Sequence, residues 1–275
     1  MTKNKFRKIR EIQNVLESYR RFDYDYIPFG DNWTMPDGTY QYRQRGLNRL
    51  ATGFWRTVMA TLGALAIKPL YGAKVVGRKN LKALGKSGAV CISNHFNFLD
   101  TLFVRAACGH YRSYHTMGPF NNKKGLGGHI IRHGGMLPFS ANLAATKNLT
   151  REMDRLLKKG KIINFYAEQA MWLNYQKPRP MKEGALYYAV KFNVPVLPVF
   201  CTFQRNARGK IRKLRIHILP AVYADEALPR PARIADLKAR AEAAWRDCYE
   251  QAYGIPLEYL PCKKKSGSPA AVDTI

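Results

Sequence analysis

The chain has 275 residues and a formal net charge of +27, and hydrophobic residues make up 46% of it. This length and composition suit one folded domain with an extension, and they exclude a disordered polymer. The charge is concentrated, because residues 38–224 carry 31 basic and 5 acidic side chains and so account for +26. Such a basic segment favours phosphate-rich or acidic partners: anionic lipid headgroups, coenzyme A, an acidic carrier protein or nucleic acid.

The first 45 residues form an N-terminal extension or cap. Residues 1–20 predict a short basic helix, and residues 21–45 are rich in Tyr, Asp, Pro and Gly, a composition typical of loops. Two interpretations stay open for this extension: a cap packed on the core, or a lid over a lipid site. The five cysteines are odd in number and form no CxxC motif, so free thiols in a reducing compartment are expected.

Residues 46–72 predict an apolar helix that docks on a membrane. Its uninterrupted apolar part is shorter than the roughly 20 residues of a membrane span. Arg56 and Lys68 bracket that part, so an interfacial helix with cations near lipid phosphates is expected, and an ordinary core helix is the alternative. The side chains expected at the membrane are Phe54, Trp55, Val58, Met59 and Leu62.

Residues 73–255 alternate between predicted strands and helices. Apolar runs at 88–94, 161–167 and 194–203 indicate buried strands, and helical patterns occupy 101–109, 145–160 and 231–252. This alternation predicts an α/β fold with a mainly parallel or mixed sheet flanked by helices, following the N-terminal membrane-docking helix. Residues 256–275 are expected to form a flexible tail.

The segment from Ser93 to Asp100 contains the most informative pattern. A predicted strand ends just before His95, and Asp100 follows at the start of a predicted helix. On a straight helix the two side chains would lie about 140° apart, so they can meet only across a turn. A carboxylate that contacts one imidazole nitrogen fixes the tautomer, and the other nitrogen can then accept a proton from a hydroxyl.

Asn94-His95-x4-Asp100 resembles the first motif of the glycerolipid acyltransferase family, which includes 1-acylglycerol-3-phosphate acyltransferases. That family has a later Phe-Pro-Glu-Gly block followed by Thr or Ser, and here residues 165–170 (FYAEQA) take its place, with Glu168 retained. Residues 194–199 (VPVLPV) match the family's Val-Pro-x-x-Pro strand, and Lys182-x-Gly184 resembles its Lys-x-Gly turn. The resemblance extends over roughly residues 70–220.

The resemblance implies an acyltransferase that moves a fatty acyl group to the hydroxyl of a lysophospholipid or related lysolipid. His95 would be the general base, oriented by Asp100, and the hydroxyl would attack the thioester of acyl-coenzyme A or acyl carrier protein directly. These thioesters are co-substrates, and no cofactor is expected. Membrane lipids are the implied partners, at the cytoplasmic face of the cell membrane, with a peripheral or monotopic attachment. The implied acceptor-binding residues are Asn94, Glu168, Arg132 and Lys182.

The family's second block is altered in this chain. An Arg at its end is taken to hold the acceptor's phosphate, but residues 135–141 read GMLPFSA and place Ala141 there. An alanine offers no donor for the guanidinium–phosphate contact. Either the acceptor lacks a terminal phosphate, or another cation replaces the missing one: Arg132 first, then Lys182 or Arg179.

Other kinds of site are less well supported by the sequence. His129 and His133 have the i, i+4 spacing of metal ligands, but no third ligand is evident and no metal is expected. The sequence contains no Gly-x-Ser-x-Gly elbow, so it does not indicate a serine lipase. The basic runs lack a nucleic-acid fold motif, so no nucleic-acid partner is expected. The alternative functions are a non-catalytic basic module that binds anionic membranes or nucleic acid, and thioester hydrolysis.

Overall fold

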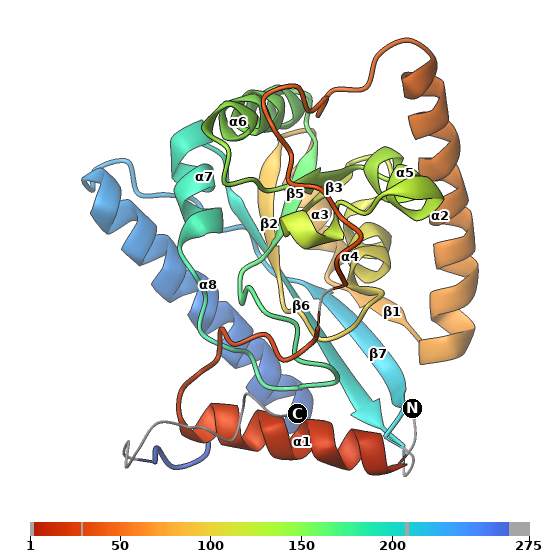
Figure 1. Ribbon diagram of the computed structural model, residues 1–275. Coiled ribbons are helices and arrows are strands. Elements are labelled where there is room, and N and C mark those ends of the chain that lie inside the picture. The colour runs from red at the N-terminus through yellow and green to blue at the C-terminus, as the bar shows by residue number, and fades with distance from the viewer. Residues whose placement is uncertain (1–2, 29, 207–208, 264–275) are drawn as a thin grey trace.

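The computed structural model describes residues 3–28, 30–206 and 209–263 and shows an α/β fold (Figure 1). Its mixed sheet has the strand order β1-β7-β6-β2-β5-β3-β4, in which β6 and β7 pair antiparallel and the other neighbours are parallel. The predicted fold class is therefore confirmed. The strands are β1 Lys74–Val76, β2 Ala89–Ser93, β3 Ser113–Met117, β4 Met136–Pro138, β5 Ile162–Tyr166, β6 Val196–Arg205 and β7 Ile211–Ile218.

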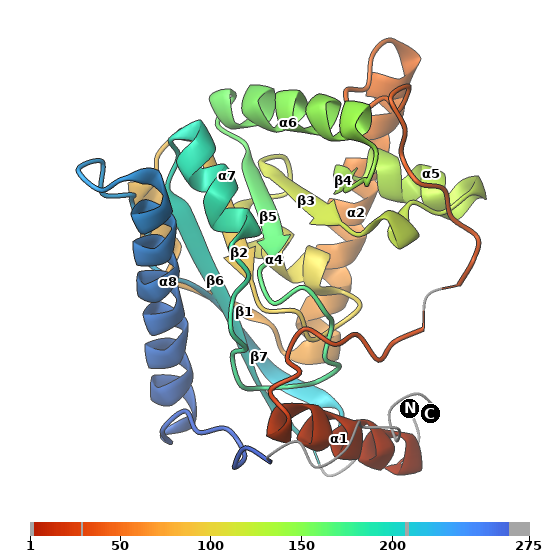
Figure 2. The same cartoon turned by 60° about the vertical axis from the view of Figure 1, so that its left-hand side comes forward.

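Helices cover both faces of the sheet, as parallel strands buried on both sides require (Figures 1 and 2). On one face α6, α7 and α8 bury side chains such as Leu149, Leu186 and Trp245 against the strands. On the other face α4 and α2 contribute Phe103 and Ile67. The helices are α1 Lys3–Ser18, α2 Leu47–Tyr71, α3 Arg78–Ala83, α4 Asp100–Cys108, α5 Gly125–His133, α6 Leu143–Lys158, α7 Gly184–Phe192 and α8 Arg230–Tyr253, with a 3₁₀ helix at Pro119–Asn121.

The helix predicted over residues 46–72 is present as α2, which packs against α4 and α5 at one side of the molecule (Figure 1). By length and composition it is the one described helix that could cross a membrane. Its outer side exposes apolar residues, and Leu47, Leu50 and Phe54 are 83%, 70% and 61% exposed. Arg56 was expected near lipid phosphates, and this is wrong, because its buried guanidinium donates to the carbonyls of His110 and Ser113.

The N-terminal extension crosses the molecule after α1 as an irregular strap, residues 22–28 and 30–34 (Figure 2). Its first part packs around the buried Trp172, whose indole nitrogen donates to the Tyr24 carbonyl at 3.0 Å. Its last part pairs with the chain next to α5 through an antiparallel bridge between Trp33 and Lys123. The strap therefore joins two regions that lie on opposite sides of the end of β5.

Candidate active site

The predicted pair of His95 and Asp100 lies in a turn between β2 and α4. His95 Nδ1 is 2.7 Å from Asp100 Oδ2, so the structure brings the two side chains together as the turn hypothesis required. The same carboxylate oxygen accepts the backbone N–H groups of Phe96 and Asn97 at 2.8 and 3.0 Å. These bonds close the turn that a straight helix could not provide, and α4 begins at Asp100 itself.

Asp100 is held rigidly within the core beside the His95 ring. Burial raises the pKa of its carboxyl, and the hydrogen bonds from His95, Asn97 and Phe96 oppose that shift by favouring the charged form. The carboxylate fixes one ring nitrogen of His95 and leaves Nε2 as the nitrogen available to a reactant.

Tyr166 supports the other side of the imidazole. Its ring stacks on that of His95, with centroids 3.9 Å apart and planes 16° from parallel. Tyr166 ends β5 and pairs in register with Ser93, so two neighbouring parallel strands deliver the two rings to the same edge of the sheet. Burial raises the pKa of Tyr166 well above its usual value, so the phenol stays neutral. The sequence alone assigned no role to Tyr166, although the pairing of β2 with β5 places it beside His95.

Glu168 holds the backbone of the site. Its Oε2 accepts the His95 N–H at 2.9 Å and the Arg179 guanidinium at 2.7 Å, while Oε1 accepts the Arg179 N–H at 2.8 Å. Both Glu168 and Arg179 are buried. Glu168 is therefore not an exposed loop carboxylate, and it fixes the position of the His95 backbone.

The other implied acceptor-binding residues also have partners within the chain. The Asn94 amide bonds to the backbone N–H and carbonyl of Cys201 and fastens the end of β2 to β6. Arg132 donates to the Lys123 carbonyl at 2.8 Å, and Lys182 pairs with Asp23 at 2.8 Å. None of these three, nor Glu168, lines the cavity described next.

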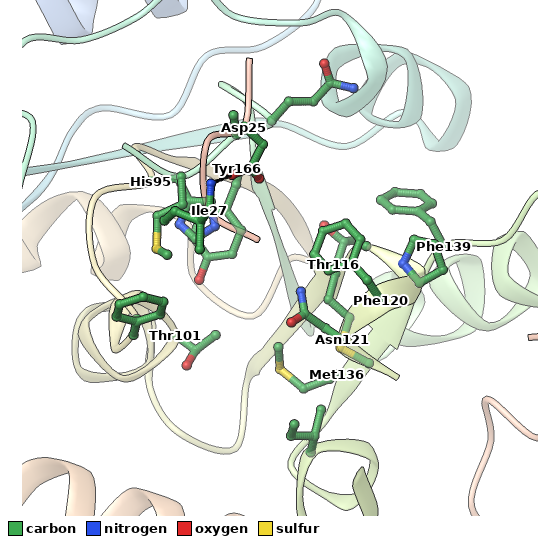
Figure 3. Close-up of a pocket in the computed structure, with 18 of the residues that line it drawn as sticks. Asp25, Ile27, His95, Thr101, Thr116, Phe120, Asn121, Met136, Phe139 and Tyr166 are labelled. Atoms are coloured by element: carbon green, nitrogen blue, oxygen red, sulfur yellow. Dashed lines mark hydrogen bonds between the residues drawn. The ribbon is translucent and has the colours of Figure 1, made fainter. Parts of the chain in front are cut away.

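A cavity of about 850 Å³ opens beside His95 (Figure 3). Tyr166 and two strap residues, Asp25 and Ile27, lie on the His95 side, whereas the opposite side is formed around Phe120, Met136 and Phe139. The wall includes Met117, Ile131 and Met171 as well and is mainly apolar, with polar side chains such as Asp25 and Gln169 among its lining residues. Such a space suits an apolar chain whose polar end lies at the imidazole.

Gln169 occupies the rim of this cavity in a strained conformation. Its φ is +67°, in the left-handed region that favours glycine. In the family's Phe-Pro-Glu-Gly block, the glycine falls at this position. The backbone here therefore has a conformation that suits glycine, although the residue is glutamine. Non-glycine residues in this region cost free energy and cluster at active sites and ligand clamps, so Gln169 is a candidate functional residue.

The expected membrane residues do not share one environment. Phe54 is exposed, Trp55 and Val58 are partly buried, and Met59 lines the cavity and so faces inward. Leu62 lies outside the residues whose side chains the structure describes.

The two histidines with metal-ligand spacing adjoin α2. The rings of His129 and His133 lie 4.1 Å apart, and His133 Nδ1 is 2.8 Å from Thr52 Oγ1. In the described part of the chain, no group of three potential ligands is assembled.

Comparison with known proteins relates the chain to enzymes that transfer acyl groups. Residues 72–202 match the family model described as Acyltransferase, a stretch that contains His95, Asp100 and Glu168. The chain therefore carries an acyltransferase domain, and its first and fourth motifs resemble those of the family's glycerolipid members. The crystal structure of the 1-acyl-sn-glycerophosphate (LPA) acyltransferase PlsC from Thermotoga maritima is similar over 74% of this chain and 84% of that one, with 19% identity and a TM-score of 0.49. A search of curated proteins gave no significant match.

Proposed function

We propose that this acyltransferase moves a fatty acyl group from acyl-coenzyme A or acyl carrier protein to the hydroxyl of a lysophospholipid or related lysolipid. The observation that carries the proposal is the His95–Asp100 pair, with a 2.7 Å contact, at the wall of a mainly apolar cavity. A general base next to an apolar space is what transfer of a fatty chain to a hydroxyl needs.

In this mechanism His95 Nε2 takes the proton of the acceptor hydroxyl as its oxygen attacks the thioester carbonyl. Asp100, bonded to Nδ1, stabilises the imidazolium that forms. The tetrahedral intermediate then expels the thiolate, which receives the same proton from His95. The products are the ester and the free thiol, with no acyl-enzyme. Glu168 would keep the imidazole at its position by accepting a hydrogen bond from the backbone N–H of His95.

We also propose a peripheral or monotopic attachment at the cytoplasmic face of the cell membrane, through the outer side of α2. Leu47, Leu50 and Phe54 expose apolar surface along one stretch of this helix, and the surrounding domain is strongly basic. Apolar insertion and attraction to anionic headgroups would act together.

The test is product analysis with the purified chain in vesicles, using a panel of lysolipids and both thioester donors. His95→Ala should lower the rate by about 10²–10⁴-fold while the protein stays folded by circular dichroism. His129→Ala is the matched control, because this histidine lies outside the cavity wall, and it should retain the wild-type rate. Unchanged transfer by folded His95→Ala would refute the mechanism. Free fatty acid formed in the presence of every lysolipid would indicate a hydrolase instead.

A further inference from the structure

We infer that the acceptor carries an ammonium-type cation next to its reacting hydroxyl, and that the Asp25 carboxylate of the strap binds it. This inference rests on the proposed function. Asp25 lines the same side of the cavity as His95 and Tyr166, where the polar end of an acceptor would lie (Figure 3). Asp25 precedes the residues 72–202 that match the family model.

The strap holds Asp25 firmly at this place. On one side of it, the Tyr24 carbonyl accepts the Trp172 indole N–H at 3.0 Å. On the other side, the Tyr26 hydroxyl accepts the Gln13 amide at 2.7 Å and the Leu173 N–H at 2.8 Å. Residues fixed on both sides of Asp25 give its carboxylate a defined position without any ligand.

The cations that could replace the missing phosphate-binding arginine are committed elsewhere. Arg179 is buried in its pair with Glu168, Lys182 pairs with Asp23, and Arg132 donates to a backbone carbonyl. Apart from His95, Lys123 is the one basic residue among the described residues of the cavity wall, and its ammonium lies 3.4 Å from the Gly30 carbonyl. The rim therefore offers a phosphate few of the charged hydrogen-bond donors that the family's arginine is taken to provide.

The groups that the rim does offer suit a cation. Gln169 stands where the family's Phe-Pro-Glu-Gly block has its glycine, and it adds an amide to the wall beside Ala170 and Met171. Burial raises the pKa of the Asp25 carboxyl, while the hydrogen bond from the Ile27 N–H and the nearby His95 and Arg179 oppose this shift. The Asp25 carboxylate accepts the Ile27 N–H at 3.1 Å and forms no salt bridge with the described residues. Such a half-buried carboxylate is stabilised by an approaching ammonium, and it repels a phosphate.

The test uses three acceptors that differ at one position. Each has a 1-O-alkyl chain and one free hydroxyl, at position 2, and position 3 bears trimethylammonium, methoxy or phosphate. The ethers leave no second hydroxyl for acyl migration or competing acylation, and the quaternary nitrogen prevents N-acylation. For the wild type, kcat/KM should be highest for trimethylammonium. Asp25→Asn should reduce the ratio of kcat/KM for the trimethylammonium acceptor to that for the methoxy acceptor about tenfold, and Asp25→Glu should keep part of the wild-type ratio.

Asp31→Asn is the matched control, because Asp31 belongs to the same strap but lies outside the cavity wall, and its ratio should equal that of the wild type. The inference is overturned if the phosphate acceptor is preferred and Lys123→Met removes that preference, or if Asp25→Asn lowers all three rates equally. If none of the acceptors is acylated in a His95-dependent reaction, the proposed function itself is refuted.

Discussion

The buried pair of Arg179 and Glu168 should be a major determinant of stability. The Arg179 guanidinium is fully buried and donates to the Glu168 carboxylate at 2.7 Å, the Phe22 carbonyl at 2.8 Å and the Ala170 carbonyl at 2.6 Å. Arg179→Met keeps most of the apolar volume but leaves the Glu168 charge buried without its partner. Breaking such a pair costs about 3–5 kcal/mol.

The exposed pair of Lys158 and Asp154 provides the matched control. Its contact distance is also 2.7 Å, but the two side chains are 75% and 38% exposed. Lys158→Met should therefore change the free energy of unfolding by less than about 1 kcal/mol. Urea denaturation at pH 7, followed by circular dichroism, measures both variants under one set of conditions.

A second change separates the lost charge partner from lost packing. Glu168→Gln added to Arg179→Met removes the buried negative charge while the amide oxygen can still accept an N–H, so the double variant should regain at least half of the loss. Equal destabilisation by Arg179→Met and Lys158→Met would refute the reasoning. A double variant no more stable than Arg179→Met would show that the cost comes from packing.

Three further predictions concern the membrane surface, the strained rim and the response to acid. Charges introduced by Leu50→Asp and Phe54→Asp, on exposed apolar positions of α2, should reduce flotation with anionic vesicles, and high salt should release the wild type only in part; complete release by salt alone would contradict insertion. Gln169→Gly relieves a φ of +67° and should raise the free energy of unfolding by about 1 kcal/mol in urea denaturation, whereas a loss would mean that the side chain stabilises the loop. Burial lowers the pKa of His115 well below 6.5, so below pH 6.5 the unfolded chain binds the proton more readily and the free energy of unfolding falls. Denaturation at pH 8.0 and 5.5 should show a smaller fall for His115→Leu, and an equal fall would exclude His115 as a source.

The sequence predicted the fold class and the His95–Asp100 contact because both depend on local patterns. Alternating apolar runs indicate strands and helices wherever the chain folds, and a strand followed by a turn and a helix limits where five residues can go. The direction of individual side chains depends on tertiary neighbours. Helical spacing identified α2, but it could not show that Arg56 and Met59 face the protein, since that depends on which side α4 and α5 cover.

The role of Glu168 could not be read from its motif for a similar reason. Its contacts are to the His95 N–H and the Arg179 side chain, and the acidic residue alone does not reveal which groups a fold brings to it. The sequence showed only that Asp25 belongs to a loop rich in aromatic and acidic residues. Its position at the cavity depends on Trp172 and Tyr26, which lie far apart in the chain and meet only in the folded protein.

One side chain connects the two parts of the candidate site. Arg179 binds Glu168, which holds the His95 backbone, and it also binds the Phe22 carbonyl at the start of the strap that carries Asp25. The turn that positions the proposed base and the segment that forms the rim are therefore fixed to the same guanidinium. Because the strap precedes the stretch that matches the family, its rim residues could change the acceptor without altering His95 or Asp100. The same link means that weakening Arg179 should disturb acceptor binding and turnover together, whereas Asp25 substitutions should act on the choice of acceptor.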